Sequence, residues 1–200
     1  MFIRNDRIEP KRLQRNFIGN MFKSLWENVI RRSGDDVFEN IRGNFLFKNL
    51  STKELHFVTD IVHIRDFKKD EIIFHQKDAG SGMYIISKGR VAITVYDQNT
   101  SSDAANEKEA LITELVSGDF FGEIALVQQN GIRSATARAT EQTRLIGFFK
   151  PNLIEIIERR PSAGVKILLK LSEVLGRRLV ETTDMVSDLT DQLNALKKSC

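Results

Sequence analysis

Residues 117–136 read SGDFFGEIALVQQNGIRSAT, and the rest of the chain is best interpreted outward from this stretch. A Gly-Asp turn at 118–119 precedes Gly122 and Glu123, and the apolar run at 124–127 can form one or two helical turns. The start of a helix offers free N–H groups to an anion, and a glycine there lets the anion approach the backbone. The stretch therefore predicts a site for a phosphate-sized anion.

An arginine on the far side of a turn completes this predicted site. The QQNG turn at 128–131 can fold Arg133 back toward Gly122, where its guanidinium would supply a fixed positive charge and paired donors. Glu123 would repel a phosphate, but it suits a ligand that also carries hydroxyl groups, as a ribose does. Taken singly, such an arginine is more often a solvated surface charge. The order of the residues is what favours a site.

That order, FGEIAL, a short loop and then Arg-Ser-Ala, resembles the phosphate-binding cassette of the cyclic-nucleotide-binding domain family. We refer to residues 121–135 as the cassette. The resemblance implies that the backbone amides of Gly122 and Ala125, with Arg133 and the Ser134 hydroxyl, hold the cyclic phosphate. It implies that Glu123 accepts from the ribose 2′-hydroxyl. Three further cassette residues are expected around the ligand: Phe121, Ile124 and Ala135.

The overall composition is that of a globular protein, with 200 residues, 41% hydrophobic, and a net charge of +3. No apolar run reaches the roughly 18 residues that a membrane span needs. Charged residues near the N-terminus interrupt any signal-peptide pattern. A single cysteine, Cys200, excludes a disulfide framework and favours a reducing compartment. We therefore expect a cytoplasmic protein.

The positive charge is concentrated at the N-terminus, where residues 1–34 hold eight Lys/Arg and three Asp/Glu, a net +5. From Glu9 to Arg32 apolar residues recur at three- and four-residue steps, which predicts a basic amphipathic helix. This helix either packs across the following domain or, alternatively, docks on a protein partner or an anionic membrane. A second short helix is expected through Val37, Phe38 and Ile41.

Further along, the hydrophobic pattern changes from helix to strand. Ser51 and Glu54 have the spacing of a capping box, which opens a helix. Short β-branched and aromatic runs then follow at 71–75, 83–87, 90–96 and 110–115, separated by glycines or polar turns. The resemblance adds closing strands within 134–149, and the polar stretch 97–109 is expected to be a loop. We predict an α+β fold, an antiparallel, jelly-roll-like β-roll flanked by N-terminal helices and a long C-terminal helix.

The last part of the chain is predicted to be one long helix from Pro161 or Ser162. Positions that step by four and three form a coiled-coil pattern, here called the leucine seam: Leu168, Ser172, Leu175, Leu179, Thr182, Val186, Leu189, Leu193 and Leu196. A seam of this length favours a parallel homodimer.

Within this helix, LSEVLGRRLVETTDMVSDL resembles the dimerisation helix of bacterial catabolite activator proteins. The resemblance implies that Thr182 and Thr183 contact the adenine of cyclic AMP, the second from the partner subunit. From the sequence alone, a threonine in the leucine seam could equally well set the register of the coiled coil.

Together these patterns predict a non-catalytic receptor for cyclic AMP, with cyclic GMP the less favoured ligand. We expect three parts: an N-terminal extension (1–44), the β-roll (45–160) and the dimerisation helix (161–200). No catalytic triad or paired carboxylates stand out, and the three histidines lack metal-ligand spacing, so we expect no cofactor or metal.

The resemblance to catabolite activators lacks their helix-turn-helix domain, because this sequence ends at Cys200. We therefore expect no direct binding to nucleic acid. Two alternatives stay open. The chain could be a structural dimerisation module whose cassette binds nothing, or the sensor part of a larger transcription factor or enzyme.

Overall fold

The computed structural model describes residues 36–96 and 109–199. The predicted amphipathic helix at Glu9–Arg32 and the predicted loop at 97–109 lie outside these residues, apart from Glu109. The described chain opens with a helix over 36–43, as predicted, followed by a short 3-10 helix, η1 (Phe45–Phe47), and α2 (Thr52–Ile61). The capping box at the start of α2 is confirmed, because Ser51 N donates to Glu54 Oε2 at 2.7 Å.

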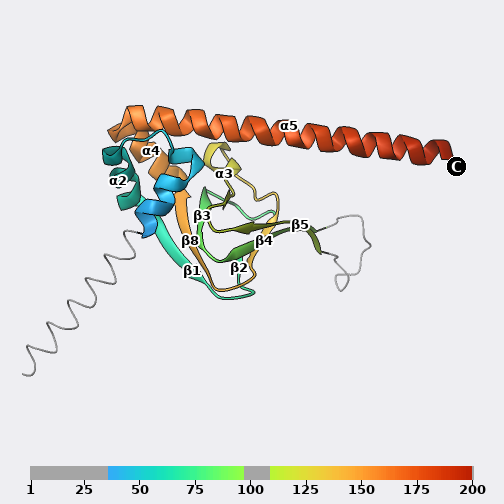
Figure 1. The fold of residues 1–200 in the computed structure, drawn as a ribbon, viewed down its shortest axis with the longest axis horizontal. Helices are drawn as coiled ribbons and strands as arrows, with labels where there is room; N and C mark the ends of the chain where they lie inside the picture. The colour runs from blue at the N-terminus through green and yellow to red at the C-terminus, as the bar shows by residue number, and fades with distance from the viewer. Residues whose placement is uncertain (1–35, 97–108, 200) are drawn as a thin grey trace, which may run out of the picture.

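Two antiparallel four-stranded sheets form the body of the protein (Figure 1). The first has the strand order β1-β8-β3-β6 and the second β2-β7-β4-β5. The strand bounds are β1 (His63–Phe67), β2 (Ile72–Phe74), β3 (Gly82–Lys88), β4 (Arg90–Tyr96), β5 (Glu109–Val116), β6 (Phe120–Phe121), β7 (Thr136–Ala139) and β8 (Thr143–Phe149). The predicted β-roll is confirmed.

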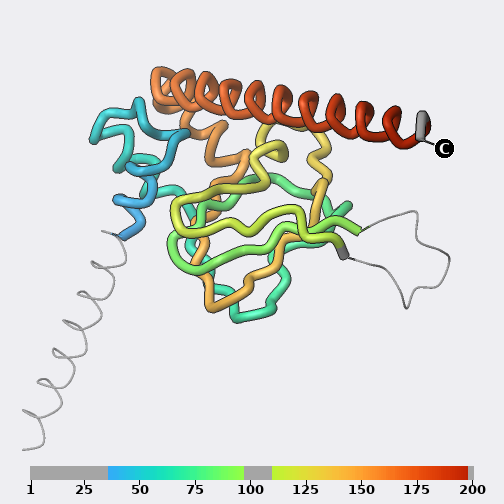
Figure 2. Tube along the Cα trace, turned by 45° about the vertical axis from the view of Figure 1, so that its right-hand side comes forward, coloured from blue at the N-terminus to red at the C-terminus, as the bar shows by residue number. Residues whose placement is uncertain are grey.

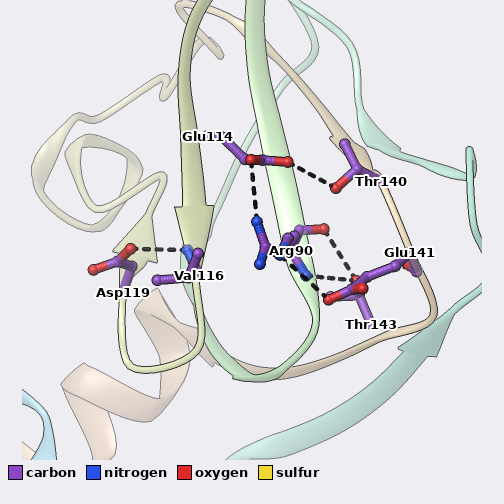
Figure 3. Close-up of polar contacts among 7 residues, drawn as sticks. All are labelled: Arg90, Glu114, Val116, Asp119, Thr140, Glu141 and Thr143. Carbon is purple, nitrogen blue, oxygen red and sulfur yellow. Dashed lines mark hydrogen bonds and ion pairs between the residues drawn. The ribbon is translucent and has the colours of Figure 1, made fainter.

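Polar side chains stabilise the turn before the cassette and link the neighbouring strands (Figure 3). Asp119 Oδ2 accepts from Val116 N at 2.9 Å, and Gly118 adopts φ +94°, so the chain reverses tightly between β5 and β6. On β4, the Arg90 guanidinium lies 3.5 Å from a Glu114 oxygen, and Thr143 Oγ1 donates to Arg90 O at 3.1 Å. These contacts tie β4 to β5 and to the start of β8.

The core has two parts. One lies between the two sheets, where both contribute fully buried side chains such as Ile86, Val91 and Leu145. The other lies between the first sheet and the helices, and Ile41, Ile146 and Ile167 are among its fully buried members. The helices are therefore part of the same folded unit as the β-roll, including the described end of the predicted N-terminal extension.

A short helix and a long helix close the chain. They are α4 (Lys150–Arg159) and α5 (Pro161–Ser199), and α5 begins where the sequence predicted. Its first turns bury Ala163, Ile167, Leu171 and Val174 against the domain. From Gly176 to Lys197 every residue is exposed. Figures 1 and 2 show α5 running along one side of the sheets and projecting beyond them.

The leucine seam is divided by this packing. Leu168 and Leu175 are half-buried because they pack against the core of their own domain, so only part of each side chain is available to another helix. The later members are exposed, including Leu179, Val186, Leu189, Leu193 and Leu196. The distal half of α5 therefore presents an apolar face to solvent, and Val165 and Leu169 are also exposed nearer its start.

Candidate functional site

The backbone of the cassette turns sharply at one glycine. β6 ends at Phe121, Gly122 follows with φ +79°, and α3 (Ile124–Val127) begins after Glu123. A side chain at Gly122 would be strained at this φ, and its Cβ would collide with Arg133 Nη1. The glycine thus allows the arginine to lie directly against the backbone, as the sequence predicted for a close approach at this point.

The Arg133 side chain lies against this turn and is 7% exposed. Its Nη1 donates to Gly82 O at 2.7 Å and to Gly122 O at 3.2 Å, and its Cζ lies 4.1 Å from the centroid of the Phe74 ring. Its buried Nε has no hydrogen-bond partner among the described residues. Burial lowers the pKa of the guanidinium, although nearby acidic groups partly offset this effect. Arginine nevertheless stays charged in proteins.

Glu123 is the most deeply buried charged residue at the site, with no exposed surface. Arg178 Nη1, on α5, lies 2.8 Å from Glu123 Oε1. The orientation of this ion pair does not make a hydrogen bond, so neither carboxylate oxygen has a hydrogen-bond partner among the described residues. A buried carboxylate in this condition has unused capacity to accept hydrogen bonds.

These groups surround a cavity of about 430 Å³ between β4, β5, the cassette and α5. This volume suits a small organic ligand. The lining residues are Phe74, Ile93, Ile112, Thr113, Leu115, Phe121, Gly122, Glu123, Ile124, Ala125, Ile132, Arg133, Ser134, Ala135, Arg178, Glu181, Thr182 and Met185. Apolar walls with a few converging charges are typical of ligand sites.

The cavity brings together every residue predicted for the site except Thr183. Phe121, Gly122, Glu123, Ile124, Ala125, Arg133, Ser134, Ala135 and Thr182 all line it. Thr183 does not, and its hydroxyl instead donates to Leu179 O at 2.8 Å within α5. The family resemblance assigned Thr183 to the partner subunit's site, and that role stays a prediction.

Sequence reasoning predicted Thr182 on α5 as part of the cavity wall, but it missed the neighbours of Thr182 on this helix and the wall formed by the second sheet. Arg178, Glu181 and Met185 stand one turn or less from Thr182, so helical periodicity around Thr182 could have found them. Thr113 and Leu115 alternate along β5, but nothing in the sequence indicated that this strand would line the cavity. Nothing in the sequence indicated that Phe74, which stacks on Arg133, would line the cavity either.

The cassette and the two sheets match a known protein family. A family model described as the cyclic nucleotide-binding domain matches residues 64–160, which include the whole cassette and both sheets apart from His63. Residues 64–160 are a cyclic nucleotide-binding domain.

Proteins similar to this chain include cAMP-activated transcriptional regulators. The chain is 31% identical over 127 residues to the cAMP-activated global transcriptional regulator of Pasteurella multocida, covering 64% of this chain and 56% of that protein. The Thermus thermophilus catabolite activator protein structure superposes with a TM-score of 0.62 and 28% identity, over 72% of this chain and 62% of that one. A cAMP-bound PfPKA-R structure superposes with a TM-score of 0.54 and 28% identity, over 62% of this chain and 42% of that one.

Similar chains thus include both a transcriptional regulator and PfPKA-R. The match to the Pasteurella relative covers little more than half of that protein's length. What is common is a regulatory domain. In residues 36–96 and 109–199, no helix has both the length and the apolar character needed to cross a bilayer. In the same ranges, the acidic, histidine and cysteine side chains form no group of three that could hold a metal ion.

Proposed function

We propose that this chain is a non-catalytic receptor for cyclic AMP. One observation carries the proposal: the buried Nε of Arg133 and both buried oxygens of Glu123 lack hydrogen-bond partners among the described residues, and both residues line the same cavity. Buried polar groups are almost always paired, so this cavity suits a ligand with both acceptors and donors. A cyclic phosphate beside a ribose hydroxyl has that combination.

Each part of the ligand has a complementary group in the cavity. Arg133 would hold the cyclic phosphate with its free Nε and its charge, assisted by Ser134 and the backbone at Gly122 and Ala125. Glu123 would accept from the 2′-hydroxyl of the ribose. The base would then extend toward Thr182 on α5. The cAMP-activated and cAMP-bound relatives support adenine as the base.

The output of the receptor would be a movement of α5. This helix lines the cavity through Thr182 and then continues with an exposed apolar face from Leu179 to Leu196. We propose that this face pairs with a second copy of the chain, as its seam spacing favours. The ligand would shift the arrangement of the two helices by its differential affinity for the two states.

The first experiment is isothermal titration of the full chain with cyclic AMP and with cyclic GMP, in parallel with Arg133→Ala. We expect tighter binding of cyclic AMP, and a loss of roughly 100-fold or more in the variant, because a buried charged donor is removed. Arg42→Ala is the matched control, since Arg42 is exposed and outside the cavity. Wild-type affinity in Arg133→Ala would refute the site. No binding to the wild type would favour the structural dimerisation module.

The dimer is tested separately by sedimentation. Leu189→Asp places a charge in the exposed apolar face, so we expect a shift from dimer to monomer at micromolar concentration. Asn194→Asp adds a charge to the same helix, one residue away from the seam, and should leave the dimer intact. A wild-type monomer with and without cyclic AMP would refute dimerisation through α5.

A further inference from the structure

The main chain of Arg133 is held by a segment outside the cassette. Residues 74–82 run from the last residue of β2 to the first residue of β3. Lys77 N donates to Arg133 O, and Arg133 N donates to Asp78 O, both at 2.8 Å. Both backbone polar groups of Arg133 are therefore paired with this segment, which fixes the point from which its side chain starts.

The same segment also confines the Arg133 side chain. Nη1 donates to Gly82 O at 2.7 Å, and the guanidinium carbon, Cζ, lies 4.1 Å from the centroid of the Phe74 ring. Gly80 leaves room for this arrangement, because a Cβ there would lie 2.5 Å from Arg133 Nε. The position of the guanidinium is thus set by one carbonyl, one ring face and one residue without a side chain.

The Phe74 ring is itself supported by other rings. Its centroid lies 6.3 Å from that of Tyr84 and 5.8 Å from that of Phe121. All three rings belong to the core between the two sheets. The negative face of an aromatic ring attracts a cation, most strongly where water is excluded, and Arg133 is only 7% exposed. The ring cluster therefore offers the guanidinium a rigid and attractive surface.

From these contacts we infer that Phe74 is a positioning residue, whose ring holds the Arg133 guanidinium where it meets the phosphate of the ligand. The inference rests on the proposed function. A long, flexible side chain that has to be ordered on binding costs affinity, and a ring that orders it beforehand removes part of that cost. Leucine at this position would be apolar too, but it lacks the negative ring face. Phe74 also lines the cavity, so the test must separate this role from direct contact with the ligand.

The test is the affinity of the full chain for cyclic AMP, measured by competition binding on the wild type, Phe74→Leu and Phe74→Tyr. Phe74→Leu should bind roughly tenfold more weakly, because a desolvated cation–π contact is lost. Phe74→Tyr keeps the ring face and should stay within roughly twofold of the wild type. Phe74→Leu is then made in an Arg133→Ala background. There it should change the affinity by less than roughly twofold, because the cation that the ring positions is gone.

Phe149→Leu is the matched control, because it removes a ring from the other side of the same cluster. The Phe149 ring lies 5.8 Å from that of Tyr84, and Phe149 does not line the cavity. This variant should stay within roughly twofold of wild-type affinity. If Phe149→Leu loses as much affinity as Phe74→Leu, the effect is one of general packing and the inference is overturned.

Two other results would also overturn the inference. In one, Phe74→Leu binds cyclic AMP as tightly as the wild type. In the other, Phe74→Leu loses as much affinity in the Arg133→Ala background as in the wild type, which would make the ring a direct contact of the ligand. The receptor itself would stand in both cases. A wild type that does not bind cyclic AMP would instead overturn the proposed function, and this inference with it.

Discussion

Arg178 Nη1 lies 2.8 Å from Glu123 Oε1, so the buried carboxylate of the cassette is neutralised by a charge from α5. Glu123 has no exposed surface, whereas the Arg178 side chain is 45% exposed. The contact joins the site to the first exposed turns of α5. A substitution at either residue should therefore change the energetic effect of a substitution at the other.

The first prediction concerns this ion pair. Arg178→Ala should lower the free energy of unfolding by about 1–2 kcal/mol, because it leaves a buried charge unpaired; the exposure of Arg178 keeps the loss below that of a fully buried pair. Urea unfolding measures it. Arg178→Ala in a Glu123→Gln background should cost much less. Equal losses in the two backgrounds would show that the pair is not coupled.

The second prediction concerns Gly122. Gly122→Ala should be destabilised by about 1–2 kcal/mol through its positive φ, and should also lose at least roughly tenfold in nucleotide affinity because the new Cβ displaces Arg133. Gly118→Ala is a matched control: it shares the positive φ (+94°) but has no atom within 4 Å of the new Cβ. It should lose stability and keep affinity. Equal losses of affinity in Gly122→Ala and Gly118→Ala would contradict a specific role for the close approach of Arg133 to Gly122.

The third prediction is a pH dependence at Glu54. Burial alone would raise the pKa of Glu54, but hydrogen bonds from Lys166 and Ser51 outweigh it and lower the pKa. A lowered pKa in the folded state means that the stabilisation is fully present above the unfolded pKa, near 4.3, and is lost as the pH falls through the folded value.

Glu54→Gln should therefore reduce the free energy of unfolding by about 0.5–1 kcal/mol at pH 7. The difference from wild type should shrink below about pH 4. Unfolding in urea at pH 7, 5, 4 and 3 measures the trend. A difference that is the same at pH 7 and pH 3 would assign the loss to helix capping alone, without the charge.

The fourth prediction concerns a glycine in the middle of α5. A Cβ at Gly176 would have no atom within 4 Å, so Gly176→Ala should raise the free energy of unfolding by about 0.5–1 kcal/mol through helix propensity. Gly164→Ala is the contrasting case, because its Cβ would lie 2.7 Å from Ile157 Cγ1, and it should be destabilised. Thermal unfolding separates them. A less stable Gly176→Ala would show that the glycine has a packing role.

The sequence predicted the cassette well because its residues are nearly contiguous, although the structure also holds Arg133 from outside the cassette, through Gly82 O and Asp78 O. It did not separate β1 from α2, because IVHIRDF continues the helix without a glycine or proline to mark the break. The other α5 residues of the cavity wall, Arg178, Glu181 and Met185, were missed for another reason. Burial of Ile167 and Leu171 sets the rotation of α5, and that burial depends on helices and sheets far away in the sequence.

Because α5 is one continuous helix, a tilt at its buried end would displace its far end. The last buried residue of α5 is Val174, which would act as the pivot, and the exposed half of the helix follows it. Between Val174 and Lys197 the helix is about 35 Å long, so a tilt of about 10° at Val174 would move the far end by about 6 Å. A movement of α5 near the cavity that is too small to alter the sheets would thus become a larger shift at the C-terminal end, where a partner helix would pack.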